Sequence, residues 1–282
     1  MLLIADSGST KTDWVLIDRN KNQTRYRTCG YNPFFIDSTS IYNSISKTLA
    51  LQLNPNLVKT IFFYGAGCST PDKTNIVKNA LFRSFTHAQI SVDHDLLGAA
   101  RSLLGNKGGF AAIIGTGSNT CIYNGTQIEK NTDSLGYLLG DEGSGSYIGK
   151  MLIRDFMRNH LPAELQHSFM QAYHLNNEQI FARLYISPFP NLFLSGFCLF
   201  AHKYKEHEYI KRVVKASFTD FFTNQVCSYE GYEKFNFNCV GSVGSVFKEQ
   251  LKEVAKSFHM EPGKFLPAPI DSLVSYHLNS DS

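Results

Sequence analysis

Three short segments rich in glycine, serine and threonine each follow an apolar run of this sequence. They occupy residues 6–13, 115–119 and 241–245, and the runs before them are typical of buried strands. Backbone N–H groups in such tight turns can hold an anion. Three of these junctions would suffice for the phosphates and the nucleoside of one nucleotide, although the first alone also suits an ordinary hairpin. The lysine signature of a P-loop is absent from the sequence.

Length, composition and charge limit the classes of protein to which the chain could belong. Its 282 residues fit one large domain or two of ordinary size, and 43% apolar residues suffice for packed cores. The 27 basic and 24 acidic residues give a net charge of +3 without a basic run, which disfavours a nucleic-acid partner. The sequence lacks a signal peptide and an apolar run of roughly 18 residues, so we expect no membrane partner and a cytoplasmic location.

Six cysteines are scattered along the chain without a C-x-x-C pair. This spacing predicts neither a zinc site nor a dense disulfide framework, and we expect most of the cysteines to be small buried hydrophobic residues. They are Cys29, Cys68, Cys121, Cys198, Cys227 and Cys239.

The elements that must position the first segment follow the order βββαβαβα. We expect strands near residues 2–5, 14–18, 23–28, 58–64 and 89–92, with helices at 38–53, 73–85 and 96–104. The polar turn at residues 19–22 favours antiparallel pairing of the strands on either side of it. Three antiparallel strands followed by alternating helices and strands predict a mixed sheet covered by helices, as in a ribonuclease-H-like domain.

The second half of the chain repeats this opening. We expect strands at 110–114, 119–123, 127–129 and 235–240, a helix-rich section from about 143 to 229, and a helix at 243–258. The repeat predicts an internal duplication, with a hinge near residues 105–109. The expected fold is therefore α/β, with two ribonuclease-H-like domains of mixed sheets flanked by helices and a nucleotide cleft between them. We expect the first domain to span residues 1–108, completed by a tail helix at 270–282, and the second to span 109–269.

Five motifs in order give a more specific indication. They are D-x-G-S-T-K-T-D at 6–13, H-D-L-L-G-A-A at 94–100, I-I-G-T-G-S-N at 113–119, G-D-E-G-S-G at 140–145 and V-G-S-V-G at 240–244. Together they resemble the N-acetylglucosamine kinase family, in the BadF/BadG/BcrA/BcrD ATPase group of the actin-like superfamily. The resemblance covers almost the whole chain. It implies actin-like ATPase domains and the transfer of the γ-phosphoryl group of Mg-ATP to a hydroxyl, expected to be O6, of an amino sugar.

Two carboxylates take roles from this resemblance. A kinase that acts on a sugar hydroxyl needs a carboxylate to take its proton, and Asp95 matches the family's base position. Taken alone, Asp95 is more typical of a helix N-cap than of a base, and Asp93 is the neighbour most easily confused with it. Asp6 would hold Mg²⁺, directly or through water, since hard oxygen ligands suit that ion. Its alternative is an ordinary carboxylate at a strand end.

The three glycine-rich segments supply the nucleotide ligands that the resemblance implies. Hydroxyl groups can donate hydrogen bonds to phosphate oxygens, and glycines let the backbone approach closely. Lys11 could contact phosphate or be a surface residue. The expected phosphate ligands are Gly8, Ser9, Thr10, Lys11, Thr12, Gly115, Thr116, Gly117 and Ser118, and Gly241, Ser242 and Gly244 resemble the adenosine loop.

The implied sugar ligands are mostly amides, carboxylates and small residues, which suit a polyol. They are Asn32, Gly65, Gly67, Asn119, Gly136, Tyr137 and Asp141. Asp141 and Glu142 could instead cap the helix that starts near residue 143. Residues 133–137 read Asp-Ser-Leu-Gly-Tyr where the family commonly has Gly-Gly-Trp-Gly-His, so N-acetylglucosamine, N-acetylmuramic acid and glucosamine all stay open as substrates. Ser7 and Ser9 replace frequent glycines, which is tolerable if they avoid positive φ.

Two other functions stay under consideration. The alternative is an ATPase that activates a partner reductase or dehydratase, which would hold an iron–sulfur cluster between two subunits through nearby cysteines. The closest pair here, Cys227 and Cys239, is separated by eleven residues. A nucleotide-sensing module is disfavoured because a candidate base is present. The C-x-C-G zinc motif of another bacterial sugar kinase group is missing, and the oligomeric state, a homodimer included, is left open.

Overall fold

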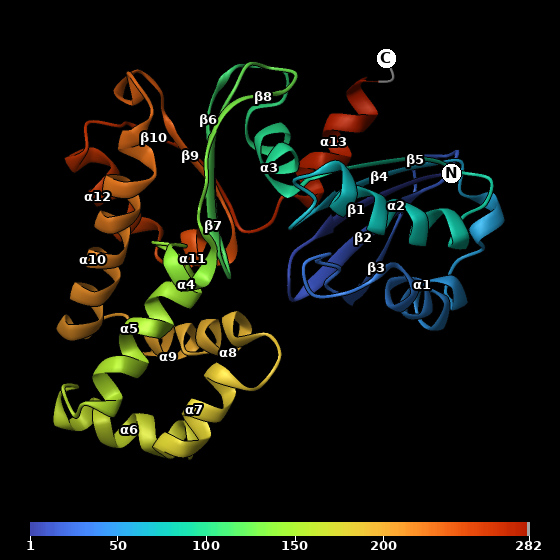
Figure 1. Ribbon diagram of the computed structural model, residues 1–282. Helices are drawn as coiled ribbons and strands as arrows, with labels where there is room; N and C mark the ends of the chain where they lie inside the picture. Colours follow the sequence, from blue (N-terminus) through green and yellow to red (C-terminus); the bar gives the residue numbers. More distant parts are fainter. Residues whose placement is uncertain (281–282) are drawn as a thin grey trace. The chain divides into compact units, whose positions relative to one another are not determined.

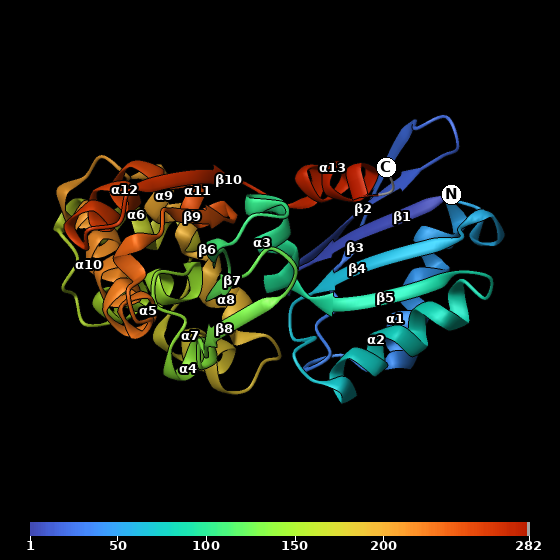
Figure 2. The same cartoon turned by 90° about the horizontal axis from the view of Figure 1, so that it is seen from above.

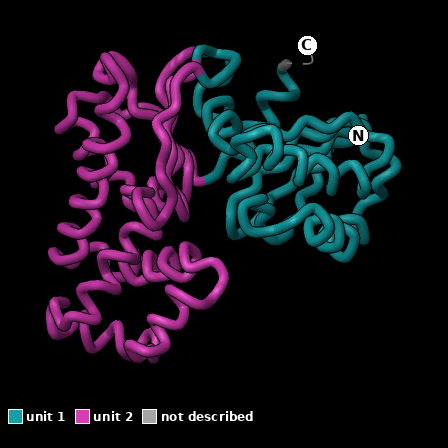
Figure 3. Tube along the Cα trace, in the orientation of Figure 1, with its two compact units in different colours: residues 1–107, 124–128, 268–282 teal, residues 108–123, 129–267 magenta. Residues whose placement is uncertain are grey.

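A computed structural model of the chain describes residues 1–280, which divide into two compact units (Figure 3). Unit 1 comprises Met1–Lys107, Asn124–Ile128 and the residues from Ala268 on; unit 2 comprises Gly108–Tyr123 and Glu129–Pro267. Each unit contains one five-stranded mixed sheet with helices packed against it. The predicted α/β class with two such sheets is confirmed.

Unit 1 starts with three antiparallel strands and then alternates helix and strand, as the sequence predicts. The sheet order is β3-β2-β1-β4-β5, with β1 antiparallel to β2 and parallel to β4 (Figures 1 and 2). Its elements are β1 (Leu2–Ser7), β2 (Lys11–Ile17), β3 (Gln23–Cys29), α1 (Ser38–Lys47), β4 (Thr60–Gly65), α2 (Pro71–Ser84), β5 (Gln89–His94), α3 (Asp95–Leu104) and α13 (Ile270–Ser280), with 3-10 turns at Leu49–Leu51 and Pro55–Leu57.

Alternate residues of β1 serve two cores, because successive side chains of a strand point to opposite faces. Leu3 and Ala5 pack with residues of α1 and α2, whereas Ile4 packs with residues of α13. The C-terminal helix α13 thus covers the second face of the unit 1 sheet (Figure 2). Residues 270–280 of the expected tail helix thus pack on this sheet, and residues 281 and 282 of that expectation lie outside the described part.

Unit 2 repeats the arrangement. Its sheet order is β10-β9-β6-β7-β8, so β6 takes the central place of β1, with β7 antiparallel on one side and β9 parallel on the other. The elements are β6 (Gly109–Ile114), β7 (Ser118–Tyr123), β8 (Ile128–Thr132), α4 (Gly136–Leu139), α5 (Gly145–Met157), α6 (Ala163–Tyr173), α7 (Asn177–Tyr185), α8 (Pro190–Gly196), α9 (Cys198–Lys203), α10 (Glu208–Asn224), β9 (Phe237–Val240), α11 (Ser242–Val246), α12 (Lys248–Ser257) and β10 (Pro262–Leu266), with 3-10 turns at Val226–Ser228 and Tyr232–Lys234.

Two predicted helices are shorter than expected. The helix predicted at 38–53 ends at Lys47, because Thr48 leaves the helical region with φ −125° and ψ −76°. The four-residue apolar spacing nevertheless continues, since Leu49 and Leu53 are buried from the following 3-10 turn and loop. The helix predicted at 243–258 is interrupted at the fully buried Phe247, which separates α11 from α12.

Strand β10 was not predicted. It begins with Pro262 and Gly263, two residue types that are rare in strands. Proline is tolerated at the first residue of an edge strand, and β10 is the edge beside β9.

Half of the six cysteines are buried, fewer than the majority that we expected. Cys68, Cys121 and Cys239 are buried, while Cys198 and Cys227 are half-buried and Cys29 is exposed. Within residues 1–280, the longest apolar helices all fall short of what a membrane crossing requires.

Candidate active site

The first predicted phosphate segment forms the turn between β1 and β2. The N–H of Gly8 donates to the carbonyl of Lys11 at 3.0 Å, which closes the turn. The N–H of Gly30, just after β3, donates to the carbonyl of Thr10 at 3.2 Å, so the turn lies against the end of the third strand. Ser9 and Thr10 are thereby held at the tip of the turn.

Ser7 and Thr12 form the base of this turn. The Thr12 hydroxyl donates to the carbonyl of Cys29 at 2.9 Å and lies 2.8 Å from the Ser7 hydroxyl, which accepts from the N–H of Tyr31 at 3.1 Å. Neither Ser7 nor Ser9 has a positive φ, so serine fits at both positions. Because Thr12 is fully buried, its geometry favours a role within the hairpin, and its contact with phosphate stays a prediction.

Lys11 has a partner within the hairpin. Its ammonium lies 2.6 Å from the carboxylate of Asp13, which also accepts from Arg27 at 2.7 Å. Partial burial would raise the pKa of Asp13, but the hydrogen bonds from the two cations lower it below its ordinary value. The geometry thus gives Lys11 an interaction that needs no nucleotide.

Three acidic residues, Asp6, Asp93 and Asp95, lie near the carboxyl ends of the parallel strands of unit 1. The pKa of Asp6 is raised from 3.8 to about 7, first by burial and then by the charges of Asp95 and Asp13. Among the described residues the Asp6 carboxylate makes no hydrogen bond or ion pair, and that of Asp95 lies only against His94, at 3.3 Å from Nδ1. His94, which accepts from the N–H of Leu96, is the N-cap of α3; the N-cap interpretation of Asp95 is therefore wrong.

These carboxylates fit a divalent cation. Because Asp6 and Asp95 repel each other, a cation beside them would stabilise their charged forms. Mg²⁺ in particular uses one or two carboxylates together with phosphate oxygens and water. No group of three or more His, Cys, Asp or Glu side chains in residues 1–280 could hold a metal alone, so the remaining ligands would have to come from a nucleotide and water. Asp93, in contrast, already accepts a hydrogen bond from Ser91 at 2.9 Å.

Asn32 lies beside the tip of the first turn. Its amide donates to the hydroxyl of Ser9 at 3.1 Å, and its carbonyl oxygen accepts from the N–H of Phe34 at 3.0 Å. Gly67 has φ +78°, and a Cβ atom there would overlap the Asn32 side chain, so only glycine fits. The structure thus brings a predicted phosphate ligand and two predicted sugar ligands together.

The small residues after β4 lie close to the candidate base. Gly65 packs against the ring of Phe63 and the sulfur of Cys68. Burial, followed by the charges of Asp95 and Asp93, raises the pKa of the Cys68 thiol to about 12. Cys68 is therefore within electrostatic range of Asp95.

The second predicted phosphate segment is fastened to the start of α5. The N–H of Gly115 donates to the carbonyl of Gly117 at 2.9 Å, and the N–H of Gly145 donates back to Gly115 at 2.8 Å. The carbonyl of Thr116 accepts from both the N–H and the hydroxyl of Ser146, at 3.0 and 2.6 Å. A Cβ atom on Gly115 would meet nothing within 4 Å, which leaves room for a ligand beside the loop.

Asp141, which precedes α5, makes a hydrogen bond to the second phosphate segment. Its carboxylate accepts from the N–H of Ser118 at 3.2 Å, and its own N–H donates to Ser134 at 2.8 Å, in a backbone with φ +55°. Burial raises the pKa of Asp141 to about 6, although the Ser118 hydrogen bond opposes the shift. The N-cap of α5 is Ser144, so the alternative role of Asp141 and Glu142 as caps of this helix is wrong.

The predicted adenosine loop follows β9. At Gly241, with φ +132°, a Cβ atom would overlap the carbonyl oxygen of Ile114, so glycine allows the ends of β6 and β9 to approach. Ser242 is the first residue of α11, and Gly244 packs against the sulfur of Cys239. The loop therefore lies at the same edge of the sheet as the second phosphate loop.

The remaining predicted sugar ligands, Asn119, Gly136 and Tyr137, each lie in a different local environment. The side-chain oxygen of Asn119, on β7, accepts from the amide of Asn131 at 2.9 Å. Gly136 is the first residue of α4, and Tyr137 packs against the unit 2 core while its carbonyl accepts from Lys150 at 3.3 Å. Their contact with sugar stays a prediction.

Sequence reasoning missed Gln225 and Ser146. Ser146 fixes the second phosphate loop from α5, and Gln225 reaches the same loop from the end of α10, with its amide nitrogen 2.9 Å from the hydroxyl of Ser118. No spacing in the sequence signals the latter contact, which joins residues 107 positions apart.

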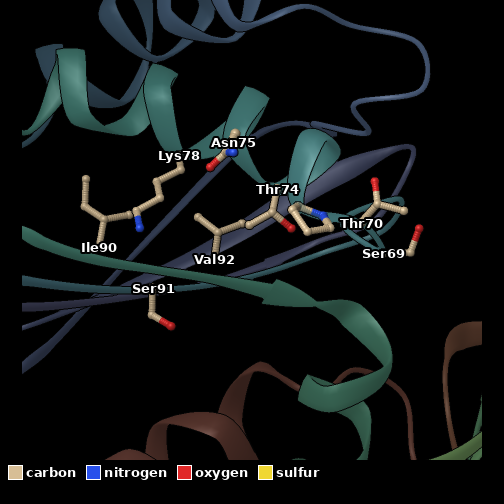
Figure 4. Close-up of a pocket in the computed structure, with 9 residues that line it drawn as sticks. Ser69, Thr70, Thr74, Asn75, Lys78, Ile90, Ser91 and Val92 are labelled. Carbon is tan, nitrogen blue, oxygen red and sulfur yellow. The ribbon is translucent and has the colours of Figure 1, made fainter.

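A separate polar groove runs along β5 and α2 in unit 1, with a volume of about 530 Å³ (Figure 4). Ile90 and Val92 point from β5 towards α2, whereas Ser91 points to the other face. None of the predicted site residues lines this groove.

Comparisons with known proteins place the chain in a family. The model of the BadF/BadG/BcrA/BcrD ATPase family matches residues 5–221, more than half of the chain. A structure from Porphyromonas gingivalis, proposed to be that of an N-acetylglucosamine kinase, is 36% identical, with a TM-score of 0.94 over 100% of both chains.

More distant structures show the fold alone. A protein from Chromobacterium violaceum, also proposed to be an N-acetylglucosamine kinase, is 14% identical with a TM-score of 0.69 over 98% of each chain. A ROK family glucokinase from Streptomyces griseus, in complex with glucose and AMPPNP, is 13% identical with a TM-score of 0.56 over 98% of this chain and 97% of that one. A search of curated protein sequences finds no match.

Proposed function

This chain belongs to the BadF/BadG/BcrA/BcrD ATPase family, and we propose that it is an ATP-dependent kinase that phosphorylates an amino sugar. The observation that carries the proposal is the pair Asp6 and Asp95. Neither carboxylate has a structural partner beyond His94 among the described residues, and burial, followed by repulsion from Asp95, raises the pKa of Asp6. Titratable groups perturbed in this way are typical of sites that bind cations or move protons.

Asp95 is the general base in this proposal. Its carboxylate is about a fifth exposed and would accept the proton of the sugar hydroxyl. The hydroxyl oxygen would attack the γ-phosphorus, and the bond from that phosphorus to the β–γ bridging oxygen would break and release ADP. Asp6 would hold Mg²⁺, directly or through water. ATP would supply the phosphoryl group, and Mg²⁺ would supply positive charge that neutralises the phosphate oxygens. A positioned base typically contributes about 10²–10⁴ in rate.

The other proposed ligands divide between the two parts of the chain. In the first domain, residues 1–108 with 270–282, Ser9 and Thr10 donate to phosphate and Asn32 orients the sugar. In the second domain, residues 109–269, the loop at 115–118 binds phosphate and the loop at 241–244 binds adenosine. Asp141, whose buried carboxylate is fixed by the N–H of Ser118, accepts hydrogen bonds from the sugar.

N-acetylglucosamine is the substrate we propose first. The support is the full-length match, at 36% identity, to the Porphyromonas gingivalis protein proposed to be an N-acetylglucosamine kinase. The changed stretch at 133–137 lies directly before the segment that carries Asp141, so we expect it to influence which acyl-amino group is accepted. We propose O6 as the acceptor hydroxyl.

The alternative, an ATPase that activates a reductase, needs accessible cysteines for a shared cluster. Cys239 is buried under Gly244, and burial raises the pKa of its thiol far above the ordinary value. A buried, protonated thiol is a poor ligand for a cluster at a subunit surface. The cysteine positions therefore favour the kinase.

ADP release from Mg-ATP tests the proposal. The purified chain is assayed with and without N-acetylglucosamine, N-acetylmuramic acid and glucosamine, next to Asp95→Asn. Asp93→Asn is the matched control, because that carboxylate is held by Ser91. We expect one sugar to raise turnover. Asp95→Asn should lower that turnover by a factor of about 10²–10⁴ and leave the Kd for nucleotide unchanged, and the turnover of the control should stay within a few-fold of wild type. Sugar-independent release, or visible iron–sulfur absorbance, would contradict the kinase.

A further inference from the structure

Gln225 ties the second phosphate loop to Glu142 from a part of the chain that the family model does not match. Its amide nitrogen lies 2.9 Å from the hydroxyl oxygen of Ser118 and 3.1 Å from a carboxylate oxygen of Glu142. Gln225 as a whole is only 2% exposed. Its backbone is fixed as well, because Gln225 is the C-cap of α10 and its carbonyl accepts from Ser228 at 2.6 Å.

The carboxylate of Glu142 sets the orientation of this amide. If the amide were turned over, its oxygen would face a carboxylate oxygen, and two acceptors would meet without a proton between them. In the orientation observed, the amide oxygen of Gln225 is buried and has no hydrogen-bond partner in the described part of the chain. An unpaired buried acceptor costs free energy, so the two contacts of the nitrogen must outweigh that cost.

This orientation decides what the Ser118 hydroxyl can do. A serine hydroxyl has one proton to donate and two lone pairs that accept. Because Gln225 donates to Ser118, one lone pair is occupied, and the proton has no acceptor among residues 1–280. The N–H of Ser118 is already used by Asp141, so the hydroxyl is the donor of this residue that remains available.

We propose that Gln225 is a positioning residue, which turns the hydroxyl proton of Ser118 towards a phosphate oxygen of the bound nucleotide. The inference rests on the proposed nucleotide site and deepens it. The neighbouring carboxylates of Asp141 and Glu142 would repel an anion. The ammonium of Lys150 lies within electrostatic range of both and offsets part of this repulsion. An anionic oxygen is the acceptor to which a serine hydroxyl binds most strongly.

Two variants of Gln225 test the proposal. Gln225→Glu keeps the shape but places a carboxylate against Glu142, and it would accept the proton of Ser118 and draw it inward. Gln225→Leu removes the donor without adding charge. The matched control is Gln166→Leu on α6, because Gln166 also has a buried, unpaired amide oxygen and a nitrogen that makes two hydrogen bonds, to Phe156 and Asn159.

The dissociation constants for Mg-ADP and for adenosine are measured by calorimetry, with the Tm of each variant. We expect both Gln225 variants to weaken Mg-ADP about tenfold or more and adenosine less than about twofold, since the lost bond would be made to a charged group of ADP. Ser118→Ala should have the same effect, and combining it with Gln225→Leu should add little. Gln166→Leu should leave both constants unchanged.

Three results would overturn the inference: Mg-ADP affinity unchanged in both Gln225 variants, a parallel loss of ADP and adenosine, or effects of Ser118→Ala and Gln225→Leu that add in full. If the wild-type chain shows the expected Gln225 dependence but phosphorylates no sugar, the proposed kinase fails and the inference stands. A wild-type chain that does not bind Mg-ADP would overturn both.

Discussion

Replacing Asp6 by asparagine should stabilise the chain although it removes a residue on which the proposed activity depends. Burial and the neighbouring charges of Asp95 and Asp13 raise the pKa of Asp6 from 3.8 to about 7 in the folded state. Asp13 lies directly opposite Asp6 in the antiparallel pair of β1 and β2. An amide of the same shape has no charge to desolvate and repels neither neighbour.

The sign and size of the effect follow from proton linkage. Between about pH 4 and pH 7 the folded chain holds a proton on Asp6 that the unfolded chain has lost, so the free energy of unfolding falls as the pH rises through this window. A shift of about three units corresponds to at most about 4 kcal/mol. We therefore expect Asp6→Asn to be more stable than wild type at pH 8 by on the order of 1–4 kcal/mol, a rise of several degrees in Tm. The difference should vanish near pH 4.

Thermal unfolding from pH 4 to pH 9, without Mg²⁺ or nucleotide, measures this directly. Asp13→Asn is the control of opposite sign, because its carboxylate is paired with Lys11 and Arg27 and its pKa is lowered. It should be less stable than wild type at pH 8. Equal Tm values for Asp6→Asn and wild type at pH 8, or a difference that persists unchanged to pH 4, would refute the reasoning.

Three further predictions concern single side chains. Tyr64→Phe removes a buried hydroxyl that makes two hydrogen bonds, one of 2.8 Å to His277 on α13, and should lower the free energy of unfolding in urea by about 1–3 kcal/mol; unchanged stability would show that this contact is dispensable. Gly241→Ala should lower Tm more than Gly136→Ala, because a Cβ atom overlaps the backbone only at the first position, and equal losses would contradict this. If the ionised form of Asp141 binds the sugar, the KM for sugar should rise as the pH falls through about 6, and a constant KM from pH 5 to pH 7.5 would count against that role.

The strands other than β10, and their order along the chain, could be predicted because their signals are local. Residues 2–5 and 110–114 are short apolar runs followed by turn residues, and the polar turn at 19–22 sets an antiparallel pair. Element ends were harder, since Thr48 and Phe247 interrupt helices while the apolar spacing continues through them. Tertiary pairing, which brings β10 next to β9, overrides the poor strand propensity of Pro262.

The candidate site was only partly predictable. Motif order pointed to Asp6, Asp95 and Asp141. The structure raises the pKa of Asp6 and of Asp141, and it places the carboxylate of Asp95 against His94. The same motifs could not tell a buried hydroxyl such as that of Thr12 from an accessible one, because burial depends on strands that pair across the chain. The hydrogen bonds of Gln225 to the phosphate loop join residues 107 positions apart, and no local pattern records such a contact.

The measurement that tests the central claim most directly is the ³¹P spectrum of a reaction of the wild-type chain with Mg-ATP and N-acetylglucosamine. The account predicts a phosphate monoester signal, split by the two protons of carbon 6, that grows with ADP and is absent with Asp95→Asn. A spectrum in which ADP is accompanied only by inorganic phosphate, with or without the panel of sugars, would contradict the assignment of this chain as a sugar kinase.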